Sequence, residues 1–75
     1  QGAVSAALRA WRRAAARAAA VPPHVILHDA TVAAVAASVP TSTDALLAIA
    51  GLGPVKVARW GDQLLSVVAA AAEGA

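Results

Sequence analysis

The stretch that decides the fold runs from Leu46 to Gly61 and reads LLAIAGLGPVKVARWG. An apolar segment, a turn on Gly51-Leu52-Gly53 and a proline at position 54 predict two helices joined by a tight corner. Gly51 is expected to end the first helix with a positive φ, and Pro54 suits the first position of the next. Such a corner presents free backbone N–H groups at a helix N-terminus, where a phosphate could dock.

Beyond the corner, the sequence predicts one short helix and then a longer one. Val57 and Trp60 repeat at i, i+3 and are expected to point inward, and Gly61 is predicted to be the C-terminal cap. A further helix is predicted to begin at Asp62. Its apolar face comprises Leu64, Leu65, Val67, Val68 and Ala71.

Upstream of the corner, the first predicted helix covers Val4 to about Ala20 and ends before Pro22-Pro23. Its inward stripe comprises Val4, Leu8, Trp11, Ala15 and Ala18. Residues 24–28 are expected to form a buried connector with one 3₁₀ turn. Asp29 is predicted to be the N-cap of a second helix, Ala30–Ser38, which Pro40 ends.

The third predicted helix opens with Thr41-Ser42-Thr43-Asp44, in which Thr41 and Asp44 have the spacing of a capping box. The core faces of these two helices comprise Val32, Val35, Ala36, Val39, Leu46, Leu47 and Ile49. With 24 alanines, the best helix-forming residue, among 75 residues, an all-α fold of five helices is expected.

Length and composition predict a single small domain over residues 1–75, with its core at about 4–70. The chain contains no methionine, which suggests a fragment of a larger protein, and no cysteine, which fits a cytosolic one. The longest run without Asp, Glu, Lys or Arg covers 30–43, shorter than the roughly 20 residues of a membrane span. No membrane partner is therefore expected.

Little in the sequence supports catalysis or a cofactor. Asp29, Asp44 and Asp62 are explained as caps or first-turn residues at helix N-termini, and no phosphate-binding loop with Lys-Ser/Thr is present. His24, His28 and Asp29 could be imagined as a metal cluster, but the proline-led turn does not place both histidines on one helical face. We predict no metal, no cofactor and no enzymatic activity in this domain.

The net charge is only +2, but four arginines lie within nine residues of the first predicted helix, before any acidic residue. Arg9, Arg13 and Arg17 share one face at i, i+4 and i+8, with Arg12 on the flank. One interpretation is a solvated outer face; the other is a contact with nucleic-acid phosphates or an acidic partner.

The corner is the second candidate contact. Gly51 and Gly53 would allow close approach of a phosphate, and Lys56 and Arg59 lie on one side of the following helix. The alternative is that the glycines serve the turn geometry alone. Trp60 could stack on a base, although a core role is favoured for it and for Trp11.

The order of these signals resembles the HRDC domain, the "helicase and RNase D C-terminal" module. The resemblance covers roughly residues 4–70. The matching residues are Leu8-Arg9-x-Trp11-Arg12, Val21-Pro22-Pro23-x-Val25-Ile26-x-x-Asp29, Val39-Pro40, Leu46-Leu47-x-Ile49-x-Gly51-Leu52-Gly53 with Lys56, and Trp60-Gly61. The segment from Leu46 to Trp60 also resembles a helix–hairpin–helix element, with Val57 where that motif often has alanine.

The resemblance implies a compact five-helix bundle without catalysis of its own. It also implies a parent that is a DNA helicase of the RecQ or UvrD type, or an RNase D exonuclease, in the bacterial cytoplasm at the nucleoid. Members that bind single-stranded DNA often carry an aromatic residue after the Pro-Pro pair, where this chain has His24.

We therefore predict a monomeric accessory domain that binds single-stranded or forked DNA weakly and in a salt-sensitive manner. The alternative is a module that docks on the helicase core of its own chain or on a repair partner. The residues predicted to contact nucleic acid are Arg9, Arg12, Arg13, Arg17, His24, Gly51, Gly53, Lys56 and Arg59.

Overall fold

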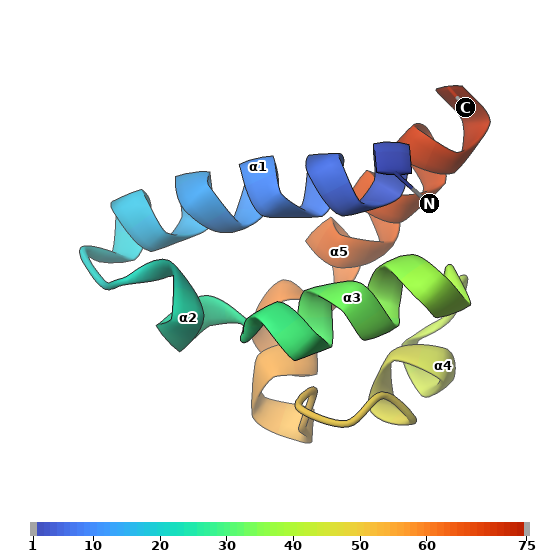
Figure 1. Ribbon diagram of the computed structural model, residues 1–75. Coiled ribbons are helices and arrows are strands. Elements are labelled where there is room, and N and C mark those ends of the chain that lie inside the picture. Colours follow the sequence, from blue (N-terminus) through green and yellow to red (C-terminus); the bar gives the residue numbers. More distant parts are fainter. Residues whose placement is uncertain (1, 75) are drawn as a thin grey trace.

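The computed structural model describes residues 2–74, which form helices and turns and include no strand (Figure 1). The helices are α1 (Gly2–Ala19), α2 (Pro23–Ile26), α3 (Asp29–Ser38), α4 (Thr43–Leu47) and α5 (Pro54–Gly74). The all-α prediction is confirmed. The helices differ from the expected five in two places. The predicted connector, residues 24–28, contains most of α2, and the last two predicted helices form the single helix α5.

A Schellman motif ends α1 just before the two prolines. The N–H of Val21 donates to the carbonyl of Ala16, and the N–H of Ala20 donates to that of Arg17. Ala20 adopts the left-handed conformation, with φ of 57°, at the position where glycine is usual. The turn sends the chain into α2, which packs back on α1.

Asp29 is not the N-cap of α3, as the sequence suggested. His28 occupies that position without a side-chain cap, and Asp29 is the first helical residue. The Asp29 carboxylate pairs instead with Arg12 of α1, 2.8 Å away. The carboxylate therefore accepts a hydrogen bond from a residue 17 positions upstream, and not from the N–H groups of its own helix.

The predicted capping box of α4 is also displaced by one residue. Ser42, rather than Thr41, is the N-cap, and its hydroxyl accepts a hydrogen bond from the N–H of Ala45 at 3.1 Å. The first N–H groups of a helix have no partner within it, and this cap satisfies one of those that α4 leaves free.

The predicted break at Gly61 is wrong, because α5 continues through it to Gly74. Gly61 is buried, and a Cβ there would lie 3.2 Å from Cγ1 of Val57 and 3.7 Å from Cδ1 of Leu46. A Cβ at position 61 would thus be tight against Val57 of the same helix and in ordinary contact with Leu46 of α4, which packs on this position. A glycine that ends a helix cannot be distinguished, from the sequence alone, from a buried glycine inside one.

Helix α1 packs on α2, α3 and α5, and α4 packs on α5 (Figure 1). The buried core comprises Val4, Leu8, Ala16, Ile26, Leu27, Val32, Val35, Ala36, Leu46, Leu52, Val57, Leu64 and Val68. Two expected core residues, Ala18 and Leu47, are exposed. Val39 is the left-handed C-cap of α3, with φ of 46°, and is half-buried, as are several other expected core residues.

Candidate nucleic-acid interface

The outward face of α1 carries Arg9, Arg13 and Arg17, all exposed. Their spacing places them on successive turns of the helix, opposite the buried Val4 and Leu8. No acidic residue lies within α1 to neutralise them. The three guanidiniums form a cationic row, which we call the α1 row.

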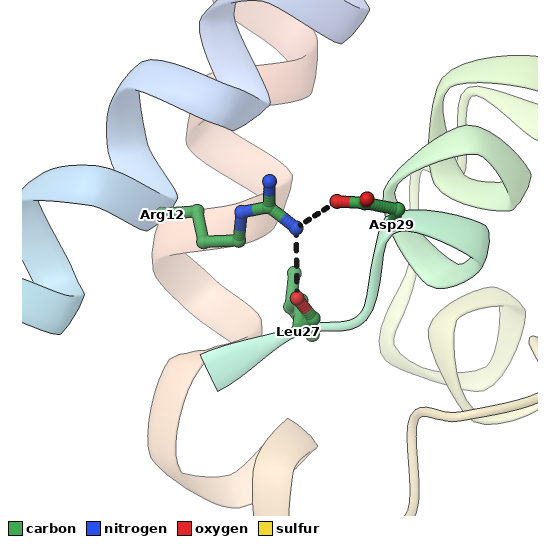
Figure 2. Close-up of polar contacts among 3 residues, drawn as sticks. All are labelled: Arg12, Leu27 and Asp29. Atoms are coloured by element: carbon green, nitrogen blue, oxygen red, sulfur yellow. Dashed lines mark hydrogen bonds and ion pairs between the residues drawn. The ribbon is translucent and has the colours of Figure 1, made fainter. Parts of the chain in front are cut away.

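Arg12 stands apart from this row, because its guanidinium is directed into the fold (Figure 2). Its Nη1 donates to the carbonyl of Leu27 at 2.9 Å and to Oδ1 of Asp29 at 2.8 Å. The side chain is 13% exposed, whereas that of Asp29 is 91% exposed. Arg12 thus joins α1 to the segment between α2 and α3, and it donates two hydrogen bonds to residues of the domain.

His24 is exposed on α2, the short helix that follows α1 (Figure 1). Its ring lies nearly parallel to that of His28, with 6.3 Å between centroids and 25° between planes. Within residues 2–74, no group of three or more His, Cys, Asp or Glu side chains could hold a metal ion. In that part of the chain, the stacked histidines therefore have no carboxylate or thiolate that would complete a metal-binding group.

The two glycines of the corner have different roles. Gly51 has φ of 92°, and a Cβ on it would collide with Oγ1 of the buried Thr31, so the fold itself requires glycine there. The predicted positive φ is confirmed. A Cβ on Gly53 would meet no atom within 4 Å, because open space surrounds that position. Both glycines are exposed, and only at Gly53 would a side chain find open space.

The first two turns of α5 carry the remaining cations. Lys56 is half-buried and Arg59 is exposed, and the Arg59 guanidinium carbon lies 4.7 Å from the centroid of the Trp60 ring. Trp60 meets Trp11 of α1 edge-on, with centroids 6.1 Å apart and planes at 80°. Nε1 of Trp11 donates to Oε1 of Gln63 at 2.9 Å. Both tryptophans are half-buried beside the core, rather than within it.

The predicted contacts do not form one continuous patch. Figure 1 shows α1 at one edge of the molecule and the corner at the opposite edge, with α3 between them in this view. Lys56 and Arg59 lie near the corner, and Trp60 links their helix to Trp11 on α1. Gln63 and the tryptophan pair were not among the predicted site residues, because pairing between α1 and α5 has no local signature in the sequence.

Comparison with known proteins identifies the class of this domain. The HRDC domain family model matches residues 1–68, and the chain therefore belongs to the HRDC family. HRDC domains are accessory domains of helicases, as the resemblance implied. No helix within the described residues is long and apolar enough to cross a membrane.

The relatives that it matches are ATP-dependent DNA helicases. The chain is 38% identical over 61 residues to UvrD2 of Mycobacterium tuberculosis and of Mycobacterium bovis, covering 81% of this chain and 9% of each relative. It is 33% identical over 63 residues to RecQ of Haemophilus influenzae, covering 84% of this chain and 10% of the relative. The chain thus spans about a tenth of the length of these proteins. No solved structure matches it.

Proposed function

We propose that this domain is a nucleic-acid-binding accessory module of an ATP-dependent DNA helicase, and that it holds single-stranded or forked DNA by its phosphates. The matched relatives are helicases, which favours that parent over an RNase D-type exonuclease. Such a parent works in the cytoplasm at the nucleoid. The domain acts as a monomer beside the helicase core of its own chain and contributes no catalytic group.

One observation carries the proposal. Within residues 2–74, the only ion pair joins Arg12 to Asp29, so the other five cations have no acidic partner there. Three of them form the α1 row, although like charges at i, i+4 oppose the helix by a few tenths of a kcal/mol per pair. Phosphates would neutralise these charges, whereas Arg12 serves the fold.

The phosphate contacts that we propose are the α1 row, Lys56, Arg59 and the open backbone at Gly53. His24 lies on α2, the short helix that follows α1, and adds a weaker contact. Gly51 and Arg12 maintain the fold beside this surface, Gly51 by its positive φ and Arg12 by its bonds to Leu27 and Asp29. Because phosphates do not encode sequence, binding is expected to depend little on base order.

The test is a titration of the domain with single-stranded and forked DNA at several salt concentrations. Five single-strand phosphate contacts give a slope of log K against log salt of about −3.5, and replacing the α1 row by alanine brings it to about −1.4. A variant with Lys at positions 9, 13 and 17 controls for charge and should keep the slope. An unchanged slope in the alanine variant would contradict the contribution of the α1 row.

A second function, docking on the helicase core, is favoured by a different surface. A groove of about 350 Å³ between α4 and α5 is lined by Thr43, Leu47, Pro54, Val57, Ala58 and Asp62. Leu47 is 42% exposed and the nearby Val55 is 80% exposed. Apolar side chains left in water beside a groove are typical of a surface that a protein partner covers. Leu47→Ser should weaken docking and leave DNA binding unchanged.

A further inference from the structure

We propose that the first turns of α5 form a stacking site for one unpaired nucleobase, in which Trp60 is the platform and Arg59 its removable cover. The site comprises Lys56, Arg59, Trp60 and Gln63 of α5 with Trp11 of α1, and we call it the tryptophan strip. This inference rests on the proposed nucleic-acid binding and adds that the domain contacts a base as well as phosphates.

Helix geometry places these side chains together. Lys56, Trp60 and Gln63 follow at i, i+4 and i+7, and therefore lie on one side of α5, with Arg59 on its flank. Asp62 is two residues beyond Trp60 and lies on the far side of the helix from the ring. The strip thus combines two cations, an amide and an aromatic ring without an acidic group among them.

Contacts with α1 hold the Trp60 ring in place. Trp11 meets it edge-on at 6.1 Å, an orientation that aromatic pairs prefer. Trp11 is in turn fixed by its 2.9 Å hydrogen bond to Gln63, one turn beyond Trp60 on the same helix. A ring whose orientation is fixed before binding loses little freedom when a base stacks on it.

Arg59 lies over a face of Trp60, and its guanidinium belongs to an exposed side chain. An exposed cation–π contact strengthens an association by about two- to fivefold. A base stacked on an aromatic side chain strengthens it by about five- to 150-fold. The base therefore displaces the guanidinium, which is then free to bind an adjacent phosphate.

A core role for Trp60 accounts for its contact with Trp11 but not for the cation that lies over the ring. Trp60 is half-buried beside the core, and the side chain that lies over its ring belongs to an exposed arginine. The combination of stacking ring and flanking cations is the arrangement by which proteins bind single strands without sequence preference.

The intrinsic fluorescence of the chain can test the site directly, since Trp11 and Trp60 are its only aromatic residues apart from the histidines. In the unaltered domain both tryptophans emit, and in Trp60→Leu only Trp11 does, so the comparison of the two assigns the quenching to Trp60. An eight-nucleotide oligothymidylate and an abasic strand of equal charge are titrated at low salt. We expect thymidylate to quench the emission and to bind at least fivefold more tightly than the abasic strand.

Two variants separate the platform from its cover. Trp60→Leu, checked for helicity by circular dichroism, should remove the difference between the two strands while both still bind. Arg59→Ala removes one phosphate contact from both strands but also removes the cover that a base must displace. It should weaken the abasic strand by a factor of about two to five, weaken thymidylate less, and retain the quenching.

The outcomes distinguish this inference from the proposed function. Equal binding of the two strands without quenching overturns the stacking site and leaves phosphate binding intact. Loss of quenching in Arg59→Ala overturns the role of Arg59 as a cover, because the ring would then need the cation to bind a base. Failure of both strands to bind at low salt overturns the proposed function and the stacking site together.

Discussion

Arg12 and Asp29 form an ion pair of 2.8 Å in which the two partners have very different surroundings. The arginine side chain is 13% exposed and the carboxylate 91% exposed. The same Nη1 also donates to the part-buried carbonyl of Leu27. The arginine thus performs two tasks, and only the outer one depends on Asp29.

This asymmetry predicts unequal effects of removing the two partners. Arg12→Ala leaves the Leu27 carbonyl without its donor and should cost about 1–3 kcal/mol of stability. Asp29→Asn removes an exposed charge and should cost about 0–1 kcal/mol. Urea denaturation of the two variants measures both values. Equal losses would mean that the bond to Leu27 contributes little.

The two glycines of the corner should respond in opposite directions to alanine. Gly51→Ala forces a Cβ onto Thr31 at a positive φ and should cost about 2–4 kcal/mol. Gly53→Ala meets no atom and should leave stability unchanged or raise it by up to about 1 kcal/mol. Thermal unfolding gives the comparison, and DNA titration of Gly53→Ala then reports on the backbone contact alone.

The end of α1 offers a stabilising change. Ala20 is exposed and left-handed, a conformation that costs a residue with a Cβ roughly 1–2 kcal/mol. Ala20→Gly removes that strain but makes the unfolded chain more flexible, so a net gain of about 0.5–1 kcal/mol is expected. A lower midpoint of unfolding would show that the Schellman turn is not populated in solution.

Leu46 and Leu47 are adjacent and were both expected in the core, yet one is fully buried and the other 42% exposed. Leu46→Ala should cost about 2–5 kcal/mol, enough to unfold much of a domain of this size. Leu47→Ala should change stability by no more than about 0.5 kcal/mol. Chemical denaturation of the pair would contradict the register of α4 if the losses were similar or reversed.

Hydrogen exchange can test whether α5 is one continuous helix. Amide hydrogens of residues 61–65 should exchange as slowly as those of the neighbouring turns if the helix runs unbroken through Gly61. If instead one helix ended at Gly61 and another began at Asp62, the N–H groups of residues 62–65 would have no helical partners and would exchange fast. Hydrogen exchange followed by NMR therefore distinguishes one helix from two.

Local signals in the sequence were sufficient for most of the backbone. Proline before α2 and at the start of α5, and the positive φ at Gly51, follow from properties of single residues, and the structure confirms them. Apart from the one-residue shift of the cap of α4, two errors arose where a distant partner decides. Asp29 was predicted to be a cap because its partner Arg12 is 17 residues away and is not indicated by the local sequence. Gly61 was predicted to end a helix because the sequence does not show that Leu46 packs on it.

The candidate site was predictable in part for the same reason. The spacing of the α1 row indicates its common face, because that depends on one helix alone. Arg12 belongs to the same cluster in the sequence, and its inward direction depends on the carbonyl of Leu27. The pairing of Trp11 with Trp60 depends on how α1 crosses α5, which no spacing within either helix records.

The unbroken course of α5 also has a mechanical meaning. Its 21 residues make a stiff rod of roughly 30 Å, with the corner at one end and Gly74 at the other. The rod bears on α1 at the tryptophan pair, between those ends. One continuous helix therefore joins the corner, the contact with α4 and the crossing with α1.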